Sequence, residues 1–160
     1  MRFPEEVDNV RLVLASDHAG FALKGAIASY LQDNPEIVID DIGTYSADPV
    51  DYPPICARAA RLVVSGEMDL AVVIGGSGNG EAIAANKVRG ARAAVCHDEY
   101  TARFARRHNN ANVIAIGARV VAPELAFAVL DVFLATSFEG GRHLRRLEEL
   151  TEIEYAEAAR

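Results

Sequence analysis

The sequence predicts an α/β protein, a doubly wound Rossmann-like (flavodoxin-like) domain whose five-stranded parallel sheet carries helices on both faces. Short apolar runs alternate with helical segments from residue 11 onward, which is the pattern of successive strand–helix units. The run at residues 70–74 is apolar throughout, as expected of a parallel strand buried on both faces. Because crossovers between parallel strands are right-handed, such units wind into one sheet with helices on each side.

Each predicted strand is a short run rich in Val, Ile, Leu or Ala, and the five runs are residues 11–16, 36–42, 70–74, 91–95 and 112–116. The segments between and after the strands predict helices at residues 21–31, 55–65, 83–88, 99–108 and 123–136. Three prolines within residues 43–54 predict a loop there. After Gly140 and Gly141, a last amphipathic helix is predicted through Leu144, Leu147, Leu150 and Ile153.

Composition limits the classes of partner. The chain has 160 residues, a formal net charge of −7 and 51% hydrophobic residues, which suits one soluble domain and argues against nucleic acid as a partner. No apolar run reaches the ~20 residues of a membrane span. Cys56 and Cys96 have no metal-type spacing, and we expect reduced thiols in a cytoplasmic protein. Residues 1–10 are interpreted as a polar leader and 11–160 as a single domain.

The segment from Gly75 to Glu81, Gly-Gly-Ser-Gly-Asn-Gly-Glu, is the most informative in the chain. It follows the buried strand, and its glycines let backbone N–H groups approach a ligand. Glu81 stands where the dinucleotide fingerprint needs Gly and where the P-loop needs Lys, so the segment matches neither motif. A carboxylate beside N–H donors suits proton abstraction next to a carbonyl. The alternative is that Glu81 is only an acid favoured at a helix N-terminus.

Other polar residues allow two interpretations each. Asp17 and His18 end the first strand, either as a helix cap with a solvated histidine or as groups facing the crevice. Arg142 and Arg146 lie four apart on one helix face, as a solvated charge run or as a phosphate clamp. His108 ends a helix, where a C-terminal cap is the simpler interpretation. No pair of histidines has metal-ligand spacing, so no metal site is predicted.

Together these segments resemble the type B ribose-5-phosphate isomerase and galactose-6-phosphate isomerase family, in order, from about residue 11 to 150. The resemblance rests on the segments Ala15-Ser-Asp-His-Ala-Gly20, Asp51-Tyr-Pro53, Gly76-Ser-Gly-Asn-Gly80, Ala84-Ala-Asn-Lys87, His108-Asn109, Gly117-Ala-Arg119 and Glu139-Gly-Gly-Arg-His143. In many members of that family the proton-transfer base is a cysteine at the position of Gly75. A second subgroup, typified by actinobacterial members, has a glutamate after the glycine run instead, and Glu81 fits it.

The resemblance implies a role for each matching residue. Glu81 is the implied base, and Ser77 hydrogen-bonds the reacting oxygens. His108 assists opening of the sugar ring, with Asp17 sharing that proton traffic. The anion hole for the enediolate is implied at Gly76, Gly78, Asn79 and Gly80. Binding of the phosphate or the sugar chain is implied for His18, Asn109, Arg119, Arg142 and Arg146.

The implied reaction interconverts ribose 5-phosphate and ribulose 5-phosphate through a cis-enediol, without a cofactor or a metal. The resemblance also implies a homodimer or homotetramer with shared active sites, in which the C-terminal helix takes part in dimerisation. One alternative is an isomerase of another sugar phosphate, such as allose 6-phosphate, galactose 6-phosphate or a tetrose phosphate. Another is a nucleotide-binding α/β module without catalysis, which the failed fingerprints at Glu81 disfavour.

Overall fold

The computed structural model describes residues 9–159, so most of the expected leader lies outside the described residues. The first strand already includes Val10. The elements in chain order are β1 (Val10–Ser16), α1 (Phe21–Leu31), β2 (Ile37–Asp41), α2 (Tyr52–Val64), β3 (Leu70–Gly75), α3 (Asn79–Ala85), β4 (Ala93–Val95), α4 (Glu99–Asn109), β5 (Val113–Gly117), α5 (Pro123–Ala135) and α6 (Arg142–Ala158).

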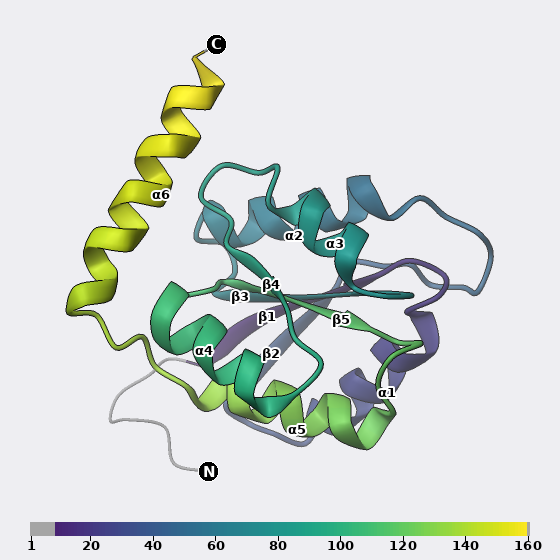
Figure 1. Ribbon diagram of the computed structural model, residues 1–160. Coiled ribbons are helices and arrows are strands. Elements are labelled where there is room, and N and C mark those ends of the chain that lie inside the picture. The colour runs from purple at the N-terminus through teal and green to yellow at the C-terminus, as the bar shows by residue number, and fades with distance from the viewer. Residues whose placement is uncertain (1–8, 160) are drawn as a thin grey trace.

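The five strands form one parallel sheet in the order β2-β1-β3-β5-β4 (Figure 1). This confirms the predicted doubly wound architecture, although β5 lies inside β4, unlike the last two strands of the flavodoxin order. The chain leaves β1 toward one edge and β3 toward the other. That reversal creates a crevice beyond the carboxyl ends of β1 and β3, where ligands of such sheets bind.

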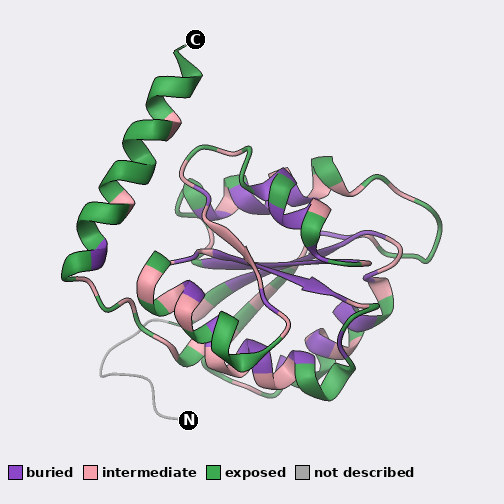
Figure 2. Ribbon diagram, in the orientation of Figure 1, coloured by how far each residue is buried: buried purple, intermediate pink, exposed green. Residues whose placement is uncertain are grey.

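Two apolar layers cover the sheet. Leu12 and Leu14 of β1 point to the face covered by α1, α4 and α5, whereas Val13 and Ala15 point to the face covered by α2 and α3. The colours of Figure 2 show the result, with buried strands between helices that are buried only on their inner sides. A strand apolar on both faces, such as β3, is what this double burial requires.

Two helices begin earlier than predicted. α2 begins at Tyr52, so Pro53 and Pro54 lie in its first turn, where proline loses no helical hydrogen bond, and the predicted loop ends before them. α3 runs from Asn79 to Ala85, so it begins inside the glycine segment and ends three residues before the end of the predicted helix at 83–88. The glycine content suggests a longer loop, but glycine is also favoured at the N-cap, which is the position of Gly78 in α3.

α6 runs along one side of the domain (Figure 1), and Glu154 in its second half accepts the N–H of Gly90, just before β4, at 3.1 Å. His143 is the buried residue within it, while Leu144, Leu150 and Ile153 are 52%, 52% and 60% exposed. Within residues 9–159, no helix has both the length and the apolar character that crossing a membrane would need.

Candidate active site

A pocket of about 480 Å³ opens at the carboxyl ends of the strands. Its lining comes from the segments that follow β1, β3 and β5 and from the start of α2, and consists of Asp17, Tyr52, Gly76, Ser77, Gly80, Glu81, Arg119 and Val120. It therefore occupies the crevice that the strand order creates. Six of the predicted site residues meet here: Asp17, Gly76, Ser77, Gly80, Glu81 and Arg119.

The glycine segment forms one wall of this pocket and is held by β5. The N–H of Ala118 donates to the carbonyl of Gly75 at 2.8 Å, and the N–H of Arg119 donates to that of Gly76 at 3.1 Å. Gly78 has a φ of +80°, and a Cβ there would lie 3.2 Å from the backbone of Gly117. Glycine is therefore needed at this position both for its conformation and for its close approach to β5.

The Glu81 side chain lies under the glycine segment and is only 3% exposed. A Cβ built on Gly75 would come within 1.7 Å of Glu81 Oε1, so the carboxylate fills the space that a side chain at position 75 would take. Burial raises the pKa of Glu81, and the charge of Asp17 adds to the rise, while the N–H groups of Glu81 and Gly78 oppose it. The acids in the first turns of α4 and α5, Glu99 and Glu124, are exposed, so a place in a first helical turn does not by itself bury a carboxylate as Glu81 is buried.

Hydrogen bonds fix three predicted residues that follow β1 and β3, of which Asp17 and Ser77 line the pocket with Glu81 and His18 is not among the lining residues. Asp17 Oδ1 accepts the N–H of Gly20 at 3.0 Å, and His18 Nδ1 accepts the N–H of Val50 at 3.2 Å. The hydroxyl of Ser77 is exposed and accepts the N–H of Asn79 at 3.3 Å. Burial, followed by the charges of Glu81 and Asp17, raises the pKa of the Cys56 thiol to about 12, so it stays protonated near neutral pH and is no candidate base.

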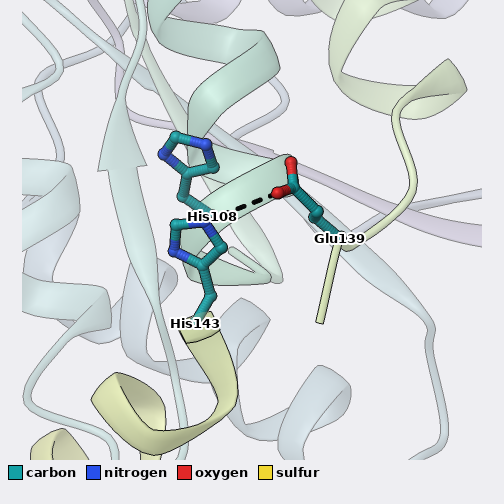
Figure 3. Close-up of side chains that lie close together, drawn as sticks. All are labelled: His108, Glu139 and His143. Atoms are coloured by element: carbon teal, nitrogen blue, oxygen red, sulfur yellow. Dashed lines mark ion pairs between the residues drawn. The ribbon is translucent and has the colours of Figure 1, made fainter. Parts of the chain in front are cut away.

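A second group of predicted residues lies where the end of α4 meets the start of α6. The rings of His108 and His143 stack with centroids 4.1 Å apart. Figure 3 shows the two rings next to each other, with Glu139 pointing toward them. Glu139 Oε1 lies 3.9 Å from His143 Nε2, and its other oxygen accepts the Nε–H of Arg107. Arg142 Nε donates to His143 Nε2 at 3.3 Å, and Arg146 Nη1 lies 3.4 Å from His143 Nδ1.

Ligand atoms of His108, Glu139 and His143 lie within 4.8 Å of one another, close enough to surround a metal ion, although no metal site was predicted. The surrounding charges do not suit a cation. Arg107 already pairs with the carboxylate, and two further guanidinium groups contact the ring nitrogens of His143. Among residues 9–159, neither Arg142 nor Arg146 forms an ion pair with a carboxylate. The excess of positive charge favours an anion at this cluster.

Within one chain, the pocket and the histidine cluster lie at opposite ends of the strands. Arg92, just before β4, donates through Nε to the carbonyls of Asn109 and Asn110, at 3.1 and 3.0 Å, which places the end of α4 at the amino ends of the strands. Glu81 lies at the carboxyl ends of the strands. The length of β5 alone separates the two ends by about 13 Å, at about 3.3 Å per residue. A single copy of the chain therefore does not bring Glu81 together with His108, Asn109, Arg142 and Arg146.

Two site residues lay outside the sequence prediction. Tyr52 lines the pocket, and its ring fills the space beside Gly80, where a Cβ would lie 2.6 Å from the ring. His143 is buried at the centre of the second cluster. Tyr52 falls in the predicted loop, where no site residue is expected. The position of His143 depends on the packing of α6 against α4, for which the sequence around His143 carries no recognisable pattern.

A family model, a curated relative and solved structures all match this chain to ribose or galactose isomerases. The family model described as Ribose/Galactose Isomerase matches residues 12–150. The ribose-5-phosphate isomerase B of Escherichia coli (strain K12) is 44% identical over 144 residues, covering 90% of this chain and 96% of that protein. The structure of Clostridium thermocellum ribose-5-phosphate isomerase B superposes with a TM-score of 0.90 at 44% identity, covering 92% and 99% of the two chains. That of Mycoplasma genitalium ribose-5-phosphate isomerase B with bound ribulose-5-phosphate gives a TM-score of 0.85 at 36% identity, covering 91% and 97%.

Proposed function

The chain belongs to the ribose/galactose isomerase family and is a sugar-phosphate isomerase, and we propose that it interconverts ribose 5-phosphate and ribulose 5-phosphate with Glu81 as the base. The observation that carries the proposal is the position of the Glu81 carboxylate, which is buried below the glycine segment and lines the pocket. The relative from Mycoplasma genitalium, whose structure contains ribulose-5-phosphate, supports the choice of sugar.

Glu81 has the environment that a carboxylate base needs. Its raised pKa, caused first by burial and also by Asp17, makes proton uptake easier than for an exposed glutamate. In the open-chain aldose, Glu81 would remove the proton from C2 and return it to C1. The hydroxyl proton on O2 would pass to O1, so that the carbonyl moves from C1 to C2 and no electrons leave the sugar.

The glycine segment would stabilise the intermediate. Removal of the C2 proton places negative charge on the C1 oxygen, and backbone N–H groups of Gly76, Gly78 and Gly80 would face this oxygen as an anion hole. The N–H of Asn79 would join them by turning from the Ser77 hydroxyl to the oxyanion. Ser77, whose hydroxyl is exposed at the pocket, would hydrogen-bond the reacting oxygens. Asp17, next to Glu81 on the pocket wall, would share the proton traffic of ring opening.

A second copy of the chain would complete the site. Within their own chain, the charged groups at the end of α4 and the start of α6 lie at the amino ends of the strands, whereas Glu81 lies at the carboxyl ends. α6 extends outward and exposes apolar side chains, which suits burial against another copy. A homodimer formed through α6 would place His108 of one copy near Glu81 of the other, where it would assist ring opening.

The phosphate would be held from both copies. His18 and Arg119 belong to the copy that supplies Glu81, and Asn109, Arg142 and Arg146 to the other. The Arg142 and Arg146 guanidinium groups have no carboxylate partner within the part of the chain that the structure describes. They can therefore donate to phosphate oxygens without first breaking an ion pair.

The two buried cysteines are free thiols, consistent with a reaction in the cytoplasm.

The test is Glu81→Gln, which keeps the shape of the side chain and removes its basicity. We expect turnover to fall by orders of magnitude while the protein stays folded and still binds phosphate. Glu124→Gln, a change in the exposed first turn of α5, is the matched control and should keep full activity. Uptake of deuterium from solvent at C1 of the product would show proton transfer. Turnover of Glu81→Gln near that of the wild type would remove Glu81 from the base role.

The family description names both ribose and galactose, so another sugar phosphate is the alternative substrate. Purified protein should be assayed against four-, five- and six-carbon aldose phosphates. The proposal predicts the highest kcat/KM with ribose 5-phosphate. A higher value with a hexose or tetrose phosphate would replace the proposed substrate while leaving the role of Glu81 open to the same test.

A further inference from the structure

His143 is a polar side chain that is buried at the centre of the α4–α6 cluster, with 1% of its surface exposed. Its ring lies next to that of His108 (Figure 3), and the two stack with an angle of 15° between the ring planes. Its two nitrogens face Arg142 and Arg146, the two cationic residues of the cluster that have no carboxylate partner among the described residues. His143 therefore contacts three of the residues that the proposed function uses.

The charges around the ring keep it neutral. Burial lowers the pKa of His143, the charges of His108, Arg142 and Arg146 act in the same direction, and Glu139 opposes them. A neutral imidazole has one acceptor nitrogen. Because Nε2 accepts the Nε–H of Arg142, the proton of the neutral ring lies on Nδ1. Arg146, next to Nδ1, then gains no hydrogen bond from the ring and keeps its donors for an anion.

We propose that His143 is a positioning residue, which fixes the Arg142 guanidinium and the His108 ring before the phosphorylated sugar binds. The inference rests on the proposed function, since it assumes that Arg142 binds phosphate. A free arginine side chain loses rotamer freedom when it grips an anion, and a hydrogen bond that orients it beforehand reduces that loss. The stacked ring limits the orientations of His108 in the same way.

The stack and the hydrogen bond can be separated by substitution. His143→Phe keeps an aromatic ring against His108 and removes the acceptor for Arg142, while His143→Gln restores an acceptor. Arg145→Ala is the matched control on α6, because Arg145 points elsewhere, is 84% exposed and pairs with Glu149. Circular dichroism and the oligomer size show whether each variant keeps its fold and assembly.

The readouts are the Kd for inorganic phosphate by calorimetry, and KM and kcat with ribose 5-phosphate. We expect His143→Phe to weaken phosphate binding and raise KM by about tenfold, the order expected for one hydrogen bond to a charged group. kcat should stay within about twofold of the wild type, since the ring stack on His108 is kept. His143→Gln should recover part of the loss, and Arg145→Ala should match the wild type.

Arg142→Ala separates failure of this inference from failure of the proposed function. Weaker phosphate binding in Arg142→Ala together with wild-type binding in His143→Phe would overturn the positioning role and leave the clamp intact. Unchanged phosphate binding in Arg142→Ala would reject the clamp itself. If His143→Phe does not fold, a ¹⁵N spectrum of the wild-type histidines decides instead. The inference predicts a neutral His143 protonated on Nδ1, and a ring protonated on Nε2 or on both nitrogens would overturn it.

Discussion

Replacing Gly75 with alanine would push a methyl group into the space that the Glu81 carboxylate fills. The new Cβ would lie 1.7 Å from Glu81 Oε1 and 2.2 Å from its Cδ, whereas ordinary contacts begin at 3.4 Å. The oxygen must therefore move by about 1.7 Å, the difference between the 3.4 Å contact limit and its 1.7 Å distance from the new Cβ. Because misplacing a reacting group by about 1 Å costs on the order of 100-fold in rate, we expect Gly75→Ala to lower kcat at least 100-fold.

Stability should change much less than activity. The atoms that meet the new methyl group belong to the end of a flexible side chain and not to the backbone. The cost should therefore lie near the low end of overpacking, about 1 kcal/mol, which corresponds to a fall in Tm of about 2–4 °C for a chain of this size. A large loss of kcat with a small loss of Tm would distinguish displacement of the base from general unfolding.

The assay is steady-state turnover of ribose 5-phosphate beside a calorimetric melt. Gly25→Ala is the control, because Gly25 lies inside α1 and the added Cβ would meet no atom within 4 Å apart from its chain neighbours and the backbone of α1. Alanine there should leave kcat unchanged and stabilise α1. The double variant Gly75→Ala/Glu81→Ala removes the overlap, so it should recover the Tm lost by Gly75→Ala and remain inactive. A wild-type kcat in Gly75→Ala would refute the reasoning that places Glu81 at the reaction.

Two further predictions concern stability. Because the folded-state pKa of Glu81 is raised, the native state keeps a proton that the unfolded chain has released, and the stability of the wild type falls as pH rises from the unfolded to the folded pKa. Glu81→Gln should therefore have a higher Tm than the wild type at about pH 8, and the difference in Tm should close toward about pH 4. A difference in Tm that stayed constant with pH in calorimetric melts would contradict the raised pKa. Lys24 is 2% exposed and its Nζ contacts both oxygens of the half-buried Asp41 carboxylate. Lys24→Met leaves that carboxylate without its cation and should lower the free energy of unfolding by about 1–3 kcal/mol in urea titrations, an outcome that an unchanged midpoint would exclude.

The sequence was sufficient for the architecture because its signals are local. Continuous apolar runs such as β3 and glycine after a strand are read without knowledge of distant residues. Helix starts were less accurate, as at Tyr52 and Asn79, because prolines and glycines suit both a loop and a first helical turn. Which of β4 and β5 lies next to β3 could be learned only from the structure, since either arrangement satisfies the same alternation of strands and helices.

The site was only partly accessible from sequence. Spacing left Glu81 as either a base or a helix-terminal acid, and its burial under Gly75, in contrast to exposed Glu124, favours the first. The contact of His143 with His108 depends on packing between segments 35 residues apart in the chain, for which the sequence carries no periodic signal. That the predicted residues form two separated groups follows from the direction of α4 relative to the sheet, which only the fold determines.

Mixing two inactive variants tests most directly whether one copy supplies Glu81 and another the arginines. Glu81→Gln and the double variant Arg142→Ala/Arg146→Ala are each assayed alone at low ribose 5-phosphate, then combined under conditions that let subunits exchange. In a mixed dimer with shared sites, one site carries all the substitutions and the other none, so activity should return to about a quarter of the wild type after random exchange. If exchange is verified by mass and activity stays at the level of the separate variants, the shared site is contradicted.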